Sequence, residues 1–545
     1  MMRTGRILIL FFAATFFVNA AAPPHGKARL RELAVFPKLN LTFGWGFDFQ
    51  GGTLNYTDNN ADPLEEIARL RQELKQQPDN IQRFLQLGGL LDQNNETNES
   101  QICYQKAEQL CRNRLTVNPR DGLILSDLGQ ALLALNKKDE AESVSRRATL
   151  ISSNEWKCWV CLGQILENRS IEQLFPQKSV ASIFALANSA PQKLLNYRPP
   201  PSALERAEAS SSEAAKCFDR AVAAAPKEAD VFVCRAGYKI ISNLENLLIQ
   251  HFRSNDNLEP NKLRSIFFFT KTAVPDIQQA ARLSPNNYKI IGMAACFEWI
   301  NAVVQAMPQK LTFDTLPYET RRSIREAMTR LENLSLDSDK RKAAGALEFL
   351  GCLNMTISGS DAAGCRAAEP YFRRAVSLDP SRDTSWNMLL GVLHGESAPS
   401  EDMVTVCESR LKYKNSAWNH LLLAKTLQKQ EQWAKATEQA AAAIKLETNN
   451  VAARLMLFAL CIRQSSDPKY LTIADQDMHS FSTNALNEIT SEDEKADRAR
   501  EILLNTAILW GLNDQPERAK ELLRTTVLKK NPDDKDAREI MSVLE

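Results

Sequence analysis

The sequence predicts an all-α protein built by repetition of helix pairs. The chain has 545 residues, several times the size of a usual globular domain, so it either divides into domains or repeats a unit. From Pro63 onward it is rich in Ala, Leu, Glu, Lys and Gln, with the apolar residues at helical spacing. Turn residues recur at fixed offsets, and Trp156 opens a new unit 34 residues after Gly122.

The composition excludes some classes of partner. Hydrophobic residues make up 44% of the chain and charged residues 24%, which is ordinary for a folded protein with a large core. The 67 Lys and Arg residues nearly balance the 66 Asp and Glu residues, so the formal net charge is +1. A chain without a strong net charge has no long-range field to gather nucleic acid, and we expect no nucleic-acid partner.

Residues 1–22 have the pattern of a secretory signal peptide. Arg3 and Arg6 precede the apolar run 7–18, and small residues follow at Ala20 and Ala22, where a signal peptidase would cut. We therefore expect export to the periplasm or out of the cell. The alternative is an uncleaved membrane anchor, although this run of twelve residues is shorter than the roughly 20 that span a bilayer.

Residues 23–62 form an extended, β-containing N-terminal segment. Apolar and polar residues alternate strictly from Leu39 to Phe49, which predicts a strand. Glycines at 51 and 52 supply a turn, and the helical pattern starts at Pro63 behind the capping residue Asp62. The strand is expected either to lie against the first helices or to bind a partner by strand addition.

The helical region carries a recognisable repeat. The unit 122–155 has large residues at its positions 4, 7 and 11, and small ones at positions 8, 20 and 27. A second unit starts at Ala417 and spans 34 residues again. Five second helices end in an apolar-then-proline phrase, at Pro119, Pro226, Pro285, Pro380 and Pro532. This pattern resembles the tetratricopeptide repeat, and the resemblance implies a right-handed superhelical solenoid of helix pairs.

The regularity of the repeat divides the chain. Tetratricopeptide-like repeats are expected at 63–167 and at 346–545, the second set ending in a C-terminal cap. Residues 213–345 are assigned to degenerate repeats with long helical insertions. The segment 168–212 contains prolines and a run of serines, and we expect it to interrupt one unit as a projecting loop. Because one repeat cannot bury its own apolar face, stacking of neighbours sets the stability.

One pair of cysteines could support redox chemistry. Cys158 and Cys161 form a Cys-x-x-Cys at a helix start, where the helix dipole favours a thiolate. This motif has three possible interpretations: buried structural cysteines, a disulfide, or a redox pair. The five histidines are dispersed, and no hydrolase, zinc-protease or phosphate-binding motif occurs in the sequence. We expect no enzyme activity, no catalytic residues, no cofactor and no metal.

The resemblance also points to a partner groove. In that family, ligands commonly lie in a concave groove lined by the first helices, at repeat positions 2, 5, 6, 9 and 12. Six groove residues carried over to this chain are Ser126, Gln130, Lys157, Gln164, Trp418 and Lys425. A mixture of aromatic, amide and charged groups suits an extended peptide or a partner helix. The alternative is that some of these residues only pack between repeats.

The sequence thus predicts a non-catalytic scaffold for protein–protein interaction that acts outside the cytoplasm. Its partner would be a protein or peptide, and peripheral association with a membrane complex is compatible with this prediction. Two alternatives stay open. One is a periplasmic adaptor of a polysaccharide- or protein-export complex, docked through the strand that ends at Phe49. The other is a thiol–disulfide oxidoreductase that uses Cys158 and Cys161.

Overall fold

The computed structural model describes most of the chain, and the described part is almost wholly helical. The described residues are 27–36, 47–50, 53–56, 63–93, 96–176, 183, 191–254, 271–306, 313–358, 362–395, 400–480 and 492–545. The chain forms two compact units. The N-terminal unit contains residues 44–388, and the C-terminal unit contains residues 389–545 together with the segment 27–36.

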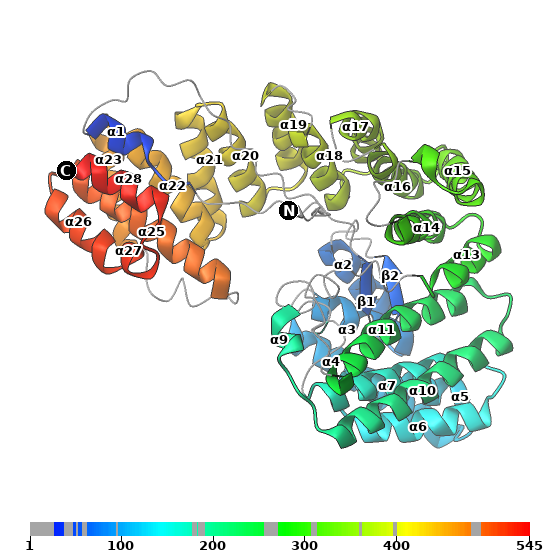
Figure 1. The fold of residues 1–545 in the computed structure, drawn as a ribbon. Helices are drawn as coiled ribbons and strands as arrows, with labels where there is room; N and C mark the ends of the chain where they lie inside the picture. Colours follow the sequence, from blue (N-terminus) through cyan, green and yellow to red (C-terminus); the bar gives the residue numbers. More distant parts are fainter. Residues whose placement is uncertain are drawn as a thin grey trace. The chain divides into compact units, whose positions relative to one another are not determined.

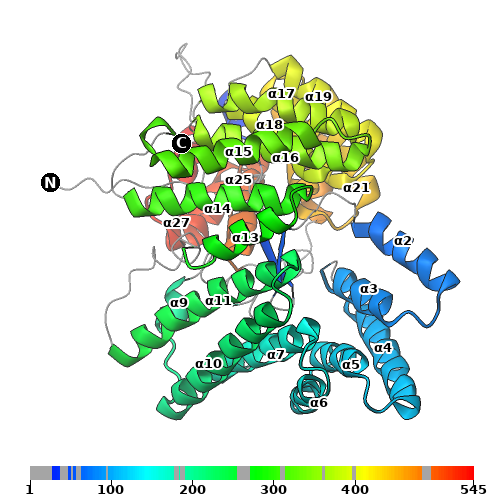
Figure 2. The ribbon, with the colours of Figure 1, turned by 90° about the vertical axis from the view of Figure 1, so that its right-hand side faces the viewer.

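Antiparallel helices follow one another along the N-terminal unit (Figures 1 and 2). The helices are α2 Pro63–Gln76, α3 Ile81–Gln93, α4 Thr97–Val117, α5 Gly122–Ala134, α6 Lys138–Ile151, α7 Trp156–Leu174, α9 Pro191–Leu195, α10 Pro201–Ala224, α11 Ala229–Ser254, α13 Val274–Leu283, α14 Tyr288–Ala306, η2 Phe313–Thr315, α15 Tyr318–Leu334, α16 Lys340–Ile357, α17 Ala362–Leu378 and α18 Asp383–Gly395. The boundary between the units falls within α18.

The C-terminal unit is a second stack of helices, and it includes a short helix from the start of the chain. These helices are α1 Lys27–Glu32, α19 Ser400–Tyr413, α20 Ala417–Lys429, α21 Trp433–Leu446, α22 Val451–Arg463, α23 Pro468–Ser480, α25 Glu492–Leu512, α26 Pro516–Thr525, α27 Val527–Lys530 and α28 Lys535–Leu544. In both units, neighbouring helices pack in pairs, such as α5 with α6 and α20 with α21. The predicted tetratricopeptide-like helix-pair fold is confirmed.

Local chemistry explains where the first helices begin. Asp121, Asn450 and Asp534 each accept a hydrogen bond from the backbone N–H three residues later, at 3.1, 2.9 and 3.1 Å. In α7, α18, α22 and α28, a side chain on the first turn also donates back to the preceding turn. Four such donors reach the carbonyl six residues earlier, at 2.7–2.9 Å: Trp159 to Ser153, Trp386 to Pro380, Arg454 to Thr448, and Arg538 to Pro532.

Three first helices end in the same left-handed turn. Asn136, Glu431 and Asp514 have φ values of 60, 58 and 59°. In each case the next residue donates its backbone N–H to the carbonyl five residues earlier, at 2.8–3.0 Å. This is the 6→1 bond of a Schellman-type helix end. Asn136 and Glu431 lie at position 15 of the units that start at Gly122 and Ala417, so the turn gives the repeat a fixed register.

Small residues at position 8 allow the paired helices to approach. A Cβ atom on Gly129 would lie 2.2 Å from the Ser145 hydroxyl oxygen of α6. A Cβ atom on Gly163 would lie 2.8 Å from the Phe218 ring of α10. Both close contacts therefore explain why this position holds a glycine in these two units.

The strand predicted from Leu39 to Phe49 is not seen as one element. Residues 37–46 lie outside the described residues, and the described chain continues as a short hairpin. Its strands, β1 Phe47–Gln50 and β2 Thr53–Tyr56, pair antiparallel with Phe47 opposite Tyr56. Strand β2 contacts α11. The hairpin therefore lies against α11, whereas the sequence predicts contact with the first helices of the chain or with a partner.

The described part of 168–212 does not project as a loop. Helix α7 continues to Leu174, and Ser210–Ser212 lie within α10. Leu194 and Leu195 of α9 are buried in the main core of the N-terminal unit, and the Tyr197 ring lies 5.2 Å from that of Phe175. The physical reason is that apolar side chains in this segment reach the surface of α7 and α11. Farther along, the helix stacking continues in 213–345 through the long helices α11, α14 and α15 and the shorter α13.

Candidate functional site

The predicted groove positions of the N-terminal unit are only partly open. Ser126 is buried and donates to the Lys157 carbonyl at 3.4 Å. Gln164 is also buried, while Gln130 is half-buried. Lys157 is exposed, and its ammonium lies 5.8 Å from the centroid of the Trp156 ring. Ser126 and Gln164 thus pack between helices instead of facing a ligand, and Gln130 and Lys157 remain candidates.

Helix α7 explains this difference, because it is enclosed by α5, α6, α10 and α11. Helices α10 and α11 have 24 and 26 residues, longer than the helices of the regular units. The additional N-terminal turns of α10 lie against the C-terminal part of α7, where Ser170 donates to the Ala207 carbonyl at 2.7 Å. Even Glu167 is fully buried, and neither of its carboxylate oxygens has a hydrogen-bond partner among the described residues.

The Cys158 and Cys161 thiols are free and buried. Cys158 donates to the Gly122 carbonyl at 3.4 Å, and Cys161 donates to the Ser126 carbonyl at 3.3 Å. Burial raises the pKa of Cys158 to about 12 and that of Cys161 to about 11. A reactive thiolate needs a lowered pKa and access to solvent, so these side chains act as helix-packing residues. Their burial favours the structural interpretation over the redox one.

The C-terminal unit already holds a peptide segment on its first helices. Residues 27–36, which we call the N-terminal segment, lie against α22, α25 and α28 (Figure 1). Leu30 and Ala34 are 3% and 8% exposed and join a core with Ile508 and Leu512 of α25. We call the surface that α20, α22, α25 and α28 present to this segment, together with Trp433 at the start of α21, the first-helix face.

Asn505 of α25 binds the backbone of the N-terminal segment with both atoms of its amide. The Val35 N–H donates to Asn505 Oδ1 at 2.8 Å, and Asn505 Nδ2 donates to the Val35 carbonyl at 2.7 Å. Asn505 is fully buried, so both of its polar atoms depend on this pairing. The contact resembles one rung of a β ladder, with a side-chain amide in place of a second strand.

An aromatic side chain completes the contact one residue later. The Phe36 ring stacks on Trp433 with centroids 6.4 Å apart, and the Lys425 ammonium lies 5.6 Å from its centroid. Burial is the main cause that lowers the pKa of Lys425 to about 8. The predicted groove residue Lys425 therefore contacts a bound segment, one from its own chain. Trp418 stays 38% exposed on the same helix.

Charged and polar contacts fix the direction of the N-terminal segment. Lys27 pairs with Asp514 at 2.7 Å, and Arg29 pairs with Glu539 of α28. Arg31 donates to the Ser465 hydroxyl at 3.2 Å. The basic side chains of α1 thus meet acidic or hydroxyl groups at one end of the first-helix face, while Phe36 binds at the other.

Asn505 is a candidate site residue that sequence reasoning missed. Because Asp514 has the left-handed turn of position 15, this repeat starts at Arg500 and Asn505 falls at position 6. Position 6 is among the ligand-contacting positions of the resembled family. The signal was therefore present in the repeat register. A repeat of this family often has proline at position 32. Pro532 lies at position 33 of the repeat that starts at Arg500, so the proline alone gives the register only to within one residue.

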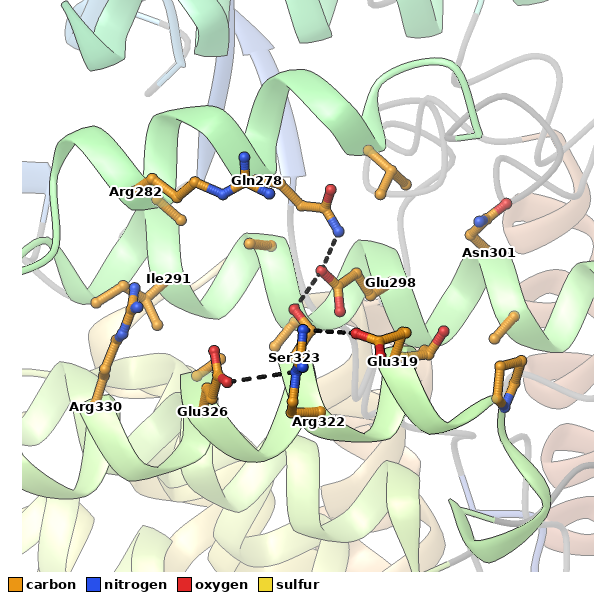
Figure 3. A pocket seen from close by; sticks show the side chains of 18 of the residues that line it. Gln278, Arg282, Ile291, Glu298, Asn301, Glu319, Arg322, Ser323, Glu326 and Arg330 are labelled. Atoms are coloured by element: carbon orange, nitrogen blue, oxygen red, sulfur yellow. Dashed lines mark hydrogen bonds and ion pairs between the residues drawn. The ribbon is translucent and has the colours of Figure 1, made fainter. Parts of the chain in front are cut away.

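A separate cavity of about 760 Å³ lies between α13, α14 and α15 of the N-terminal unit (Figure 3). Glu298, 5% exposed, accepts hydrogen bonds from Gln278 and, at 2.7 Å, from Ser323. Burial raises the pKa of this carboxyl. Arg322 pairs with Glu319 at 2.6 Å and lies 3.7 Å from Glu326. Arginines and glutamates line the cavity in equal number, so their formal charges balance.

Other classes of site find no support in the described part of the chain. Among the residues that the structure describes, no three His, Cys, Asp or Glu side chains gather as metal ligands. None of the described helices is both long and apolar enough to cross a bilayer.

Comparison with known proteins supports no closer assignment. No protein-family model matches the sequence, and no curated protein is significantly similar to it. Solved structures that are similar include yeast Tom70, with 14% identity over 85% of this chain and 94% of that one, at a TM-score of 0.30. The P58(IPK) TPR domain has 11% identity over 85% and 97%, at 0.21. Naa15/Naa10 bound to HypK-THB has 12% identity over 85% and 78%, at 0.25. These superpositions are poor, so the assignment rests on the helix ends and pair packing described above: the chain has a tetratricopeptide-like fold.

Proposed function

We propose that the protein is a non-catalytic scaffold that binds an extended polypeptide on the first-helix face of its C-terminal unit. The observation that carries this proposal is the pair of hydrogen bonds between the side-chain amide of Asn505 and the backbone N–H and C=O of Val35. A side-chain amide that pairs with backbone N–H and C=O accepts any chain in an extended conformation, as strand addition does. Backbone pairing gives affinity, and neighbouring side-chain sites then give selectivity.

The aromatic site beside Asn505 supplies that selectivity. Phe36 is held between the Trp433 ring and the Lys425 ammonium, a combination that favours an aromatic side chain over an aliphatic one. Since Phe36 follows Val35 directly, the preferred ligand is an extended segment in which an aromatic residue follows the residue paired with Asn505.

We also propose that this scaffold acts outside the cytoplasm, in contact with a membrane complex or in solution. The support is the leader pattern of residues 1–22. The test is the mass of the mature protein recovered from its own host, which should correspond to a chain that starts after Ala20 or Ala22. Recovery of a chain that keeps Arg3 and Arg6 would contradict export by cleavage.

A synthetic peptide tests the binding site. In the variant Leu30→Asp, a charge replaces a buried leucine and should release the N-terminal segment. We expect a fluorescein-labelled peptide of residues 27–36 to bind this variant, measured by fluorescence anisotropy. Adding Asn505→Ala should weaken binding about 10- to 100-fold, because two hydrogen bonds of roughly 1 kcal/mol each are lost.

The matched control is Asn513→Ala, a half-buried asparagine beyond the end of α25 for which no contact with the segment is seen among the described residues. It should bind the peptide as the Leu30→Asp parent does. Equal binding with and without the Asn505 amide, in variants that keep their helical circular dichroism, would show that this face is not the peptide site.

A further inference from the structure

We infer that the N-terminal segment is a displaceable intramolecular ligand, which leaves the first-helix face when a partner segment of the same chemistry binds there. This inference rests on the proposed function of that face and adds its regulation and the class of partner. The protein would thus be closed to partners while residues 27–36 remain in place, and open once they are released.

The segment has a short and weakly held helical part. Helix α1 has six residues, with no acidic residue in its first turn, and a helix of that length is not stable alone. The Lys27–Asp514 pair has side chains 47% and 81% exposed, and pairs so exposed contribute little to stability. Only Leu30 and Ala34 of the segment are fully buried, while Leu33, Val35 and Phe36 are partly covered.

The strongest contacts of the segment are ones that another chain can reproduce. Asn505 pairs with backbone atoms only, so it does not distinguish Val35 from a residue of a different chain. The segment itself covers Asn505, so an empty face would exchange these two bonds for hydrogen bonds to water and lose their net stabilisation. Exchange of one extended segment for another avoids that cost, which favours displacement over simple opening.

The contacts also define the partner. The first-helix face offers Asp514 and Glu539 to basic side chains, an apolar site over Gly511 and Leu544 to a leucine, and the Trp433 and Lys425 site to an aromatic ring. The partner is therefore a polypeptide with a basic helical turn that carries a leucine, followed by an extended aliphatic–aromatic pair.

Competition between the bound segment and the peptide in trans is the measurable consequence. If the open state is a minor fraction of the parent protein, the apparent dissociation constant for an added ligand rises by the inverse of that fraction. The labelled peptide of residues 27–36 should therefore bind full-length Leu30→Asp at least about ten-fold more tightly than it binds the full-length parent.

The control places the same charge two residues away, on another side of α1. Ala28 is exposed in α1, so Ala28→Asp should keep the segment in place and bind the peptide as weakly as the parent. A second measurement follows the segment itself. Excess peptide labelled with ¹³C and ¹⁵N, so that its mass differs, should speed hydrogen exchange of residues 27–36 in the parent, including the Val35 amide.

The outcomes separate this inference from the proposed function. If Leu30→Asp and the parent bind the peptide equally, or if excess peptide leaves hydrogen exchange in residues 27–36 unchanged, the segment is a permanent part of the fold and the inference is overturned. If folded Leu30→Asp binds no peptide at all, the first-helix face is not a peptide site, and the proposed function fails as well.

Discussion

At the scale of single residues, two buried carboxyl groups influence the stability of the N-terminal unit. Glu167 of α7 and Glu245 of α11 are both fully buried. Glu245 accepts hydrogen bonds from Ser170 and, at 3.0 Å, from Ser211. Burial raises the pKa of Glu245 to about 7, and burial followed by repulsion from Glu245 raises that of Glu167 well above its usual range. Both groups therefore favour the protonated form in the folded state.

The sign of the pH dependence follows from these shifts. A carboxyl whose folded pKa exceeds its unfolded value binds more protons in the folded state, so stability falls as pH rises from about 5 through 7. We expect the melting temperature to fall over this range. Glu167→Met should reduce that fall and raise the free energy of unfolding at pH 8 by about 1–3 kcal/mol, because it removes a buried carboxyl that must either take up a proton or carry an unpaired charge on folding.

Thermal melts followed by circular dichroism between pH 5 and 8 measure both effects. Glu205→Met, at an exposed position of α10, serves as the control and should leave the pH profile unchanged. A Glu167→Met variant that is less stable than the parent at pH 8 would contradict the assignment of an unpaired carboxyl.

At the scale of the helix pair, close approach at position 8 holds α7 against α10. The Cβ of Gly163→Ala would lie 2.8 Å from the Phe218 ring, closer than carbon atoms pack. Alanine improves helix propensity by about 1 kcal/mol, but overpacking a buried contact costs roughly 1–3 kcal/mol. We expect a net loss of stability, measured by urea unfolding with circular dichroism.

A double-mutant cycle identifies the ring as the cause. If the clash is with Phe218, the cost of Gly163→Ala should be smaller in a Phe218→Leu background than in the parent. Equal costs in the two backgrounds would mean that the new methyl group clashes with another neighbour.

At the scale of the molecule, both ends of the described chain meet within the C-terminal unit. Leu30 of α1 and Leu544 of α28 both lie over Gly511 of α25, and Arg29 pairs with Glu539. In a stack of helix pairs, each element is stabilised by its nearest neighbours. The last helix should therefore help to hold the N-terminal segment, although the two are separated by most of the sequence.

Substitution at the C-terminus tests this coupling. Leu544→Asp should increase the rate of hydrogen exchange at the Val35 amide by about ten-fold or more, since a coupling of about 1.4 kcal/mol corresponds to a factor of ten. Ser542→Asp adds the same charge at an exposed position of α28 and should leave that rate unchanged. An unchanged rate in both variants would show that α28 and the segment are stabilised independently.

Much of the fold was predictable because its determinants are local. Capping residues such as Asp121, the small residues at Gly129 and Gly163, and the turns before Trp159 and Trp386 act over a few residues or within one helix pair. Their spacing in the sequence is their spacing in the structure. The candidate site was predicted less well. Lys425 contacts the bound segment as a groove residue would, but Ser126 and Gln164 are buried, and Ser126 donates to the Lys157 carbonyl of the next first helix.

The sequence by itself therefore determined the all-helical class, the helix pairs and their register. Only the tertiary structure decided what occupies the first-helix face. Val35 and Asn505 are 470 residues apart, and no local pattern links them. Their contact depends on burial and on the direction of one amide, which follow from the stacking of α22, α25 and α28. Local sequence specifies which residues form a helix pair, whereas the segment bound to it depends on packing between distant parts of the chain.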